Sequence, residues 1–328
     1  MAIDAAVQRI IDAALDEKGF SEGELRYLFK IKPETEEYHA LIEASEIVRK
    51  RYALGTMLAQ IGVDSQPCPG NCFHCSFSAR YNTRPRDKWF LPDEDIVDYA
   101  EDAVRRGTNV ITLMLTAAFD FEHLIDLLAQ IRERVGCDMP IMMNMGDFTY
   151  EQAVRMKEAG VTSIFHAVRM GEGLVTSIPL ERRFETYAAA NEVGFKIGAS
   201  IENVTPIFTD DAIARLMMRM RNEVRPGCCG CGSKRLVEGT AGFSEPDFPP
   251  EKLTVYQKAF RLLLSGVCFT HGGTMYSECG NNPRDWTQHT EKDGLIKQRG
   301  TSHESLKQYM IDEGYTMEPE GPSKLWGF

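Results

Sequence analysis

Three cysteines, Cys68, Cys72 and Cys75, lie within eight residues and are the side chains of this chain best placed for chemistry. Closely grouped thiolates are what an iron–sulfur cluster needs, whereas structural zinc usually takes four ligands in two paired knuckles. Three thiols on four irons leave one iron open to a substrate or cofactor. Pro69 and Gly70 suit a tight loop that directs the sulfurs to one centre. We therefore predict a 4Fe-4S cluster here, with three buried, unreactive cysteines as the alternative.

The composition indicates a protein of the cytoplasm. The chain has 328 residues, of which 43% are hydrophobic and 26% charged. No apolar run reaches the roughly 18 residues that span a membrane, and residues 1–20 resemble an amphipathic helix more than a signal peptide. We expect a cytoplasmic location, no membrane association, and nine cysteines kept reduced. The net charge of −11 disfavours nucleic acid as a partner.

The elements that must position the cysteines alternate between strand and helix. Residues 1–53 are expected to form helices, with a capping box at Ser21 and Glu24. Apolar and β-branched runs predict strands at Thr56–Val63, Asn109–Thr116, Pro140–Met145, Thr162–Val168, Phe195–Ile201, Glu223–Cys229, Gly266–Thr270 and Thr274–Cys279. Amphipathic patterns predict helices at Asp93–Arg106, Phe121–Val135, Thr149–Ala159, Leu180–Val193, Asp210–Arg221 and Glu251–Ser265.

This alternation predicts βα units and a parallel sheet. We predict an α/β fold: a TIM-type (βα) barrel, complete or nearly so, over residues 54–316, with residues 1–53 as an N-terminal helical extension packed on it. An open doubly wound sheet has the same periodicity and is the alternative. The Pro- and Gly-rich residues 317–328 are expected to lie as a surface extension. In a barrel, the cysteine loop lies at the C-terminal mouth, where barrel enzymes carry out catalysis.

A second set of cysteines falls near the last predicted strands: Cys228, Cys229, Cys231, Cys268 and Cys279. Because ends of consecutive barrel strands are neighbours, we expect at least three of these to face the barrel interior. They are candidates for an auxiliary iron–sulfur cluster, with His271 as a further possible ligand. The vicinal Cys228 and Cys229 cannot easily both bind one iron. Unreactive thiols are the alternative.

The Cx3Cx2C spacing after the first strand of a βα barrel resembles the signature of radical S-adenosylmethionine (SAM) enzymes. That family usually has an aromatic residue before the third cysteine, and His74 here keeps a flat ring. The resemblance extends to the branch with biotin synthase, archaeal-type lipoyl synthase, the hydrogenase maturases and methylornithine synthase. It is carried by "FSEGELRYLF", "IFHAVRMGEGLVTSIPLERRFETYAAANEVGFKIGASIE" and "CFTHGGTMYSECGNNPRDWTQHTEKDG", and covers most of residues 20–315.

The resemblance implies that the open iron binds SAM and that the reduced cluster cleaves it to a 5′-deoxyadenosyl radical, which abstracts hydrogen from a substrate C–H bond. It implies a low-potential electron donor, flavodoxin or ferredoxin. It also implies cofactor-binding roles for His74, Thr116, Ala117, His166, Arg169, Glu172, Ser200 and Glu202. Arg169 would bind the SAM carboxylate through its planar guanidinium. Thr116 and Ala117 stand where the family binds the SAM amine.

Three functions remain open at this point. The first is sulfur insertion into a small-molecule or carrier-protein-bound substrate, as a sulfurtransferase of the biotin- or lipoyl-synthase type, with the auxiliary cluster supplying sulfur. The second is a carbon-skeleton mutase, a lyase or a metallocofactor maturase without sulfur insertion. The third is a non-catalytic iron–sulfur protein, which has no need of a large barrel with a mouth.

Overall fold

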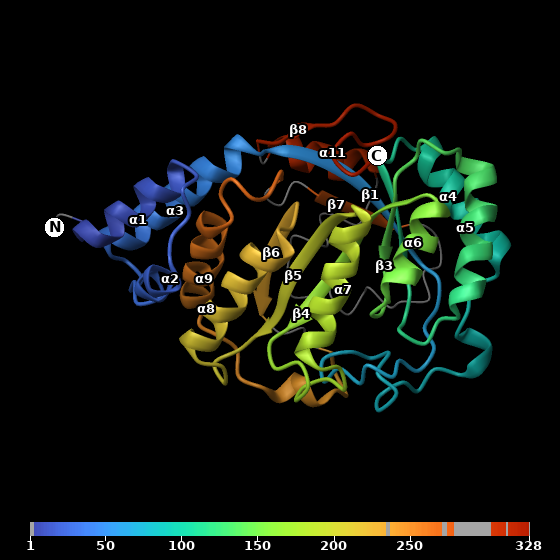
Figure 1. Cartoon of the computed structure of the whole chain (residues 1–328), viewed down its shortest axis with the longest axis horizontal. Helices are drawn as coiled ribbons and strands as arrows, with labels where there is room; N and C mark the ends of the chain where they lie inside the picture. The colour runs from blue at the N-terminus through green and yellow to red at the C-terminus, as the bar shows by residue number, and fades with distance from the viewer. Residues whose placement is uncertain (1–2, 234–236, 271–273, 279–302, 313, 328) are drawn as a thin grey trace.

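The computed structural model describes residues 3–233, 237–270, 274–278, 303–312 and 314–327. At its centre is a curved parallel sheet with helices on its outer face (Figure 1). The strands are β1 (Leu54–Gly62), β2 (Val110–Met114), β3 (Ile141–Asn144), β4 (Val161–Arg169), β5 (Lys196–Val204), β6 (Cys228–Ser233), β7 (Thr274–Glu278) and β8 (Thr316–Met317). The α-helices are α1 (Ala5–Leu15), α2 (Glu22–Leu28), α3 (Glu36–Arg51), α4 (Asp93–Arg105), α5 (Phe121–Val135), α6 (Tyr150–Glu158), α7 (Leu180–Val193), α8 (Asp210–Arg219), α9 (Pro250–Leu263) and α11 (His303–Asp312).

The strand order is β6-β5-β4-β3-β2-β1-β7. The late strand β7 therefore lies beside β1, the first strand along the chain. Every pair in this order is parallel, which requires the helical crossovers that the alternating pattern predicted. Within the described residues no ladder joins β6 to β7, so the sheet curls into a barrel that stays partly open. The predicted α/β fold is therefore confirmed as a partial barrel of parallel strands with N-terminal helices.

Two predicted strands are wrong in detail. The helix before β6 continues as a π-helical turn, Met220–Val224, and the strand begins at Cys228 instead of Glu223. The reason is that Met217, Met220 and Val224 are all fully buried at helical spacing.

The predicted strand at Gly266–Thr270 is a turn. The N–H groups of Phe269 and Thr270 both donate to the carbonyl of Gly227, at 3.0 and 3.1 Å, which is not a strand ladder. The Phe269 ring occupies the place where a side chain at Gly227 would lie, so the glycine permits this close approach.

The tail does not lie as a surface extension. Trp326 is 1% exposed and packs with Leu58, Val110 and Met142, one from each of β1, β2 and β3. Glu318 is also buried and accepts hydrogen bonds from Thr56 of β1 (2.6 Å) and from Ser323 within the tail (2.7 Å). The tail thus fills the inside of the sheet at the end of the barrel opposite the mouth.

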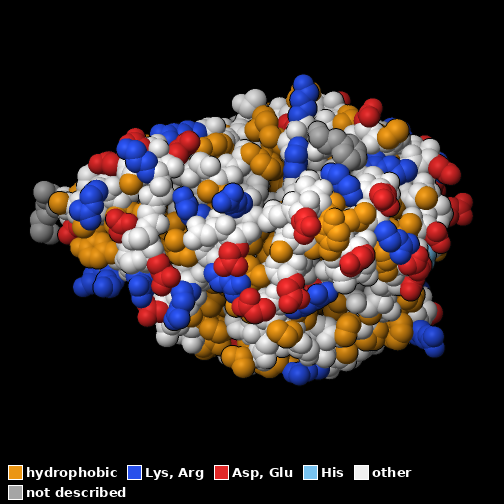
Figure 2. Space-filling model, viewed as in Figure 1, with side chains coloured by type: hydrophobic (Ala, Val, Ile, Leu, Met, Phe, Trp, Pro, Cys, Tyr) orange, Lys and Arg blue, Asp and Glu red, His pale blue; other side chains and the backbone are white. Residues whose placement is uncertain are grey.

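The N-terminal helices pack against helices of the barrel. The predicted capping box of Ser21 and Glu24 is present and starts α2. Phe29 meets the ring of Tyr256 in α9 edge to face, with centroids 4.5 Å apart. None of the helices in the described part of the chain has the length and hydrophobicity to cross a membrane. Cationic and anionic side chains alternate over this face of the molecule (Figure 2).

Candidate active site

The cysteine loop, residues 64–81, follows β1 and folds back on itself through backbone hydrogen bonds. The N–H of Cys68 donates to Phe77 (2.7 Å), and the N–H of Ala79 donates to the carbonyl of Cys68 (3.0 Å). The N–H of Cys75 donates to the carbonyl of Cys72 (3.2 Å). All three thiols are half-buried and form no disulfide. The loop therefore holds three free thiols at a site that solvent and ligands can reach.

Gly70 lies beneath two of these sulfurs. A side-chain carbon at Gly70 would stand 3.5 Å from the Sγ of Cys68 and 3.8 Å from the Sγ of Cys72. Among the described residues, no three His, Cys, Asp or Glu side chains are close enough to hold a single metal ion. A four-iron cluster is larger than one ion, so its ligand sulfurs lie farther apart. Three free thiols in a loop where Gly70 leaves space beside the sulfurs fit such a cluster.

Backbone hydrogen bonds from two neighbouring loops hold the cysteine loop in place. The N–H of Phe73 donates to Val175 (2.9 Å), and the N–H of Ser177 donates to Gly70 (2.8 Å), both across to the segment after β4. On the other side, the N–H of Gly242 donates to the carbonyl of Phe73 (3.0 Å). The position of the thiols therefore depends on two other βα connections of the barrel.

His74 lies at the contact between the cysteine loop and Gly242. Its ring is 4% exposed, its Nε2 is 3.5 Å from the carboxylate of Glu245, and it fills the space that a side chain at Gly242 would need. The structure thus places His74 between the cysteine loop and the short helix η3 (Ala241–Ser244). Its predicted contact with SAM stays a prediction.

Arg169, at the end of β4, lies next to the thiols. Burial favours its neutral form, but the acidic groups of Cys72, Glu202 and Glu172 outweigh burial and raise the pKa of Arg169. Burial raises the pKa of Cys72 to about 11, against the opposing effect of the Arg169 guanidinium. The guanidinium lies 3.6 Å from Glu202 and 3.8 Å from Glu172. The structure brings these predicted residues together as one charged group at the mouth.

Strand register explains this grouping. In the β4–β5 ladder Arg169 pairs with Glu202, and Ala167 pairs with Ser200. Partners in a parallel ladder share a face, so Arg169, Glu202 and Ser200 line the same side of the sheet. The hydroxyl of Ser200 also donates to Glu202 at 3.3 Å.

Glu172 is a buried support for Arg169. Its side chain is 0% exposed and accepts hydrogen bonds from Arg183 (2.9 Å), from the backbone N–H of Arg169 (3.2 Å) and from the hydroxyl of Thr176. With these donors around it, Glu172 fixes the turn after β4. The geometry favours this role over the predicted contact with SAM.

His166 lies on the opposite face of β4. Residues three apart on a strand point to opposite sides, so His166 faces away from Arg169 and toward α7. Its Nε2 is 3.1 Å from Asp147, and its ring meets Tyr187 edge to face at 5.2 Å. Burial lowers the pKa of His166, with Asp147 acting against this shift. The expected contact with SAM is corrected: His166 belongs to a polar network behind the sheet.

Thr116 is already bonded to a residue that the sequence reasoning missed. The backbone N–H and the hydroxyl of Thr116 donate to the two carboxylate oxygens of Asp64, at 2.7 and 2.5 Å. Asp64 is fully buried at the start of the cysteine loop. An acidic residue directly after a buried strand and before the cysteines was the signal that could have identified it. Next to Thr116, Ala117 is exposed at the mouth and abuts Gly146.

The second set of cysteines does not converge inside the barrel. Cys228 packs with the interior cluster around Trp326, whereas Cys229, Cys231 and Cys268 pack in the main core between the sheet and the helices. The reason is the strand alternation of β6, which sends Cys229 and Cys231 to the face opposite Cys228. Burial raises the pKa of Cys231 to about 12 and that of Cys229 well above its usual value. The prediction that at least three of the five face the interior is wrong. Cys279 and His271 lie outside the described residues.

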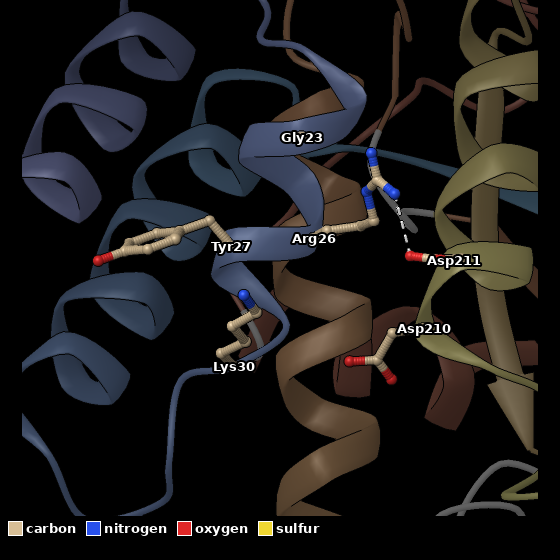
Figure 3. Close-up of a pocket in the computed structure, with 6 residues that line it drawn as sticks. All are labelled: Gly23, Arg26, Tyr27, Lys30, Asp210 and Asp211. Atoms are coloured by element: carbon tan, nitrogen blue, oxygen red, sulfur yellow. Dashed lines mark hydrogen bonds and ion pairs between the residues drawn. The ribbon is translucent and has the colours of Figure 1, made fainter.

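A separate hollow of about 330 Å³ lies between α2 and α8 (Figure 3). Arg26 reaches across it to Asp211 at 3.1 Å, and Asp210 accepts hydrogen bonds from Tyr256 and Lys252 of α9. None of the predicted site residues lines this hollow. The mouth around the cysteine loop is therefore the candidate site.

Comparison with known proteins agrees with this site. The model of the Radical SAM superfamily matches residues 64–220. Biotin synthase of Pelotomaculum thermopropionicum is 27% identical over 145 residues, which are 42% of this chain and 44% of that protein. In two further biotin synthases, from Acetivibrio thermocellus and Nostoc sp., the matched region spans 34% and 58% of the length of the protein.

Two solved structures are similar in fold. HydG, a maturase of the FeFe-hydrogenase, is 12% identical with a TM-score of 0.74, covering 97% of this chain and 77% of HydG. Methylornithine synthase, PylB, is 15% identical with a TM-score of 0.72, covering 96% of this chain and 98% of PylB. At these identities the likeness concerns the fold alone.

Proposed function

From the radical SAM domain at residues 64–220, we infer that this enzyme binds a 4Fe-4S cluster through Cys68, Cys72 and Cys75 and uses SAM to abstract hydrogen from a small-molecule or carrier-bound substrate. When bound, cluster and SAM supply a 5′-deoxyadenosyl radical. The observation that carries the proposal is that the half-buried guanidinium of Arg169 at the mouth lies close to Cys72 and Cys75, two of the three free thiols of the cysteine loop.

The chain's own residues bind and orient the cofactor. Arg169 holds the carboxylate of SAM, because a guanidinium donates two parallel hydrogen bonds to a carboxylate. Glu202 and Ser200, on the same face, accept from the amine or ribose hydroxyls. The exposed backbone around Ala117 offers carbonyl oxygens to the amine, and Asp64 holds that backbone in place through Thr116.

The interior of the barrel favours a small polar substrate. Gln60 and Thr112 are partners in the β1–β2 ladder and share the inner face with Leu58 and Val110. Both are buried, and the hydroxyl of Thr112 has no hydrogen-bond partner in the described part of the chain. A buried hydroxyl without a partner is costly, so a polar substrate group is a fitting occupant. Because Trp326 fills the opposite end, substrate enters from the mouth.

The placement of the second set of cysteines favours a reaction without sulfur insertion: rearrangement of a carbon skeleton, cleavage by a lyase or maturation of a metallocofactor. An auxiliary cluster that supplies sulfur needs several ligands beside the substrate, and of the four described cysteines Cys228 alone is on the inner face. The second candidate is a sulfurtransferase, which the resemblance to biotin synthase favours.

Anaerobic reconstitution tests whether the protein cleaves SAM and whether its reaction involves sulfur insertion. We expect about four irons per chain and release of 5′-deoxyadenosine from SAM under a low-potential reductant. Iron binding and SAM cleavage should both be lost in each of the variants Cys68→Ala, Cys72→Ala and Cys75→Ala. The variant Cys137→Ala, at an exposed position, should keep the iron content and the SAM cleavage of the wild type. SAM cleavage that survives removal of all three cysteines contradicts the proposal. About eight irons per chain support sulfur insertion instead.

A further inference from the structure

The outer side of the cysteine loop carries a cluster of cations that we call the basic rim: Arg80, Arg84, Arg86 and Lys88. Within residues 80–88 only one acidic residue, Asp87, accompanies them, although acidic residues outnumber basic ones in the whole chain, 48 to 37. Arg80, Arg86 and Lys88 are exposed. The segment runs along the lower edge of Figure 1, on the side of the loops that follow the strands.

The basic rim is poorly neutralised by the protein itself. Lys88 lies 4.0 Å from Asp87, and both side chains are more than 70% exposed. Among the described residues, neither Arg80 nor Arg86 forms an ion pair with a carboxylate. By contrast, the surface residue Arg155 forms an ion pair with Glu122 at 2.6 Å. The rim is therefore a local surplus of positive charge on an acidic protein.

This charge lies directly over the residues that flank the thiols. The guanidinium of Arg80 stacks on the ring of Phe73 at 5.5 Å, and that of Arg84 stacks on Phe77 at 4.6 Å. Phe73 follows Cys72, and Phe77 comes two residues after Cys75. Arg169, by contrast, approaches the thiols from the strand end of the barrel. The face of the cysteine loop toward Arg169 is thus available to cofactor and substrate, and the face under Arg80 and Arg84 is directed to the surface of the protein.

Two exposed apolar side chains border this surface. Phe90 is 48% exposed just after the rim, and Leu174 is 80% exposed beside Val175, to which the cysteine loop is bonded. Exposed apolar groups next to unpaired charge are typical of a protein interaction site.

We propose that the basic rim docks an acidic electron-carrier protein with a low-potential flavin or iron–sulfur centre. This inference rests on the proposed function, because a cluster at the three cysteines needs one electron from outside. The carrier loses one electron and is oxidised, a cluster held at the three cysteines would gain that electron and be reduced, and no covalent bond forms or breaks. An acidic protein is attracted to the rim and repelled by the rest of this acidic surface, which orients the encounter. Docking there brings the carrier next to the thiols without blocking the mouth.

The test uses the double charge reversal Arg86→Glu/Lys88→Glu, because both side chains are exposed and neither supports the loop. The matched control is Lys30→Glu/Lys32→Glu, which makes the same change of charge on exposed residues in the connection between α2 and α3. A purified acidic flavodoxin is the probe. We expect the rim variant to lose at least about tenfold in flavodoxin-driven SAM cleavage at low salt, with the loss shrinking as salt rises.

Dithionite, a small reductant that needs no docking surface, separates the possible outcomes. Iron content and dithionite-driven cleavage should equal wild type in both variants. Equal losses with both reductants would overturn the proposal, since the rim would then matter for the cluster and not for docking. An unchanged flavodoxin-driven rate would overturn it as well.

Direct binding tests the rim independently of catalysis. Flavodoxin should bind the wild type and the control alike and the rim variant at least about tenfold more weakly in calorimetry. If the wild type fails to cleave SAM with dithionite, the proposed function fails while this measurement still decides the docking. Flavodoxin binding that is the same for all three proteins contradicts the inference.

Discussion

The carboxylate of Asp64 accepts two hydrogen bonds from a single residue, Thr116, with its two oxygens at 2.7 and 2.5 Å from the N–H and the hydroxyl. This pair joins the end of β1, where the cysteine loop begins, to the end of β2, where the backbone at Ala117 is exposed. The two segments that would bind the cluster and the SAM amine are thus held together by one buried carboxylate.

Asp64→Asn should loosen this connection. The amide can accept from only one of the two donors and faces the other with its own NH2 group, so we expect a loss of about 1–3 kcal/mol in unfolding free energy. The apparent affinity for SAM should fall as well, while the cysteines still bind iron. Urea unfolding and SAM titration measure the two effects. Asp138→Asn, at an exposed position, is the control; a SAM affinity equal to wild type in Asp64→Asn refutes the positioning role.

Arg169→Lys should weaken SAM binding by about tenfold or more, because an ammonium cannot reproduce the bidentate contact with a carboxylate. The charge remains, so Glu172 and Glu202 keep a cationic partner and the fold should survive. Equilibrium SAM binding to the reconstituted protein is the measurement. Arg182→Lys, at a half-buried position of α7 where the side chain pairs with Glu185, should bind SAM normally.

Thr112→Val should separate stability from substrate binding. The substitution removes a buried hydroxyl that has no hydrogen-bond partner in the described residues, so thermal unfolding should occur at the same or a higher temperature. If the hydroxyl binds a polar substrate group, the KM for substrate should rise while the affinity for SAM stays constant. Thr162→Val, whose hydroxyl donates to the carbonyl of Ile141, should instead destabilise the protein.

Trp326→Ala should show how much the tail contributes to the barrel. Removing a side chain that is 1% exposed leaves a cavity, and we expect a loss of about 3–5 kcal/mol in unfolding free energy. Trp326→Phe should recover most of it, since a second aromatic ring fills most of the space. A tail that lies on the surface would give no change in either variant, as measured by denaturant unfolding.

Glu46 should make stability sensitive to acid. Partial burial alone raises its pKa, but hydrogen bonds from Lys258 of α9 and Arg49 outweigh burial and lower the pKa to about 2. A carboxyl whose pKa is lowered on folding stabilises the fold above its unfolded value of 4.5, and this stabilisation is lost as pH falls from there through 2. Glu46→Gln should therefore be less stable than wild type at pH 7, and the difference should shrink below pH 4.5. The exposed Glu43→Gln should follow wild type at every pH.

The sequence by itself determined the cysteine triad, the alternation of strand and helix, and the position of Arg169 and Glu202 at strand ends. Those features are local: ligand spacing lies within one loop, and apolar runs bounded by turn residues mark strands without reference to their neighbours. The capping box at Ser21 and Glu24 is equally local and is present as predicted.

The tertiary structure alone decided which side of a strand each residue faces. Strands buried on both faces have nearly continuous apolar sequences, so nothing in β4 marks His166 as facing α7 and Arg169 as facing the mouth. The same ambiguity concealed that Cys229 and Cys231 lie behind β6 while Cys228 lies inside. Trp326 could not be placed either, because its partners in β1, β2 and β3 are far away along the chain and meet it only when the sheet curls.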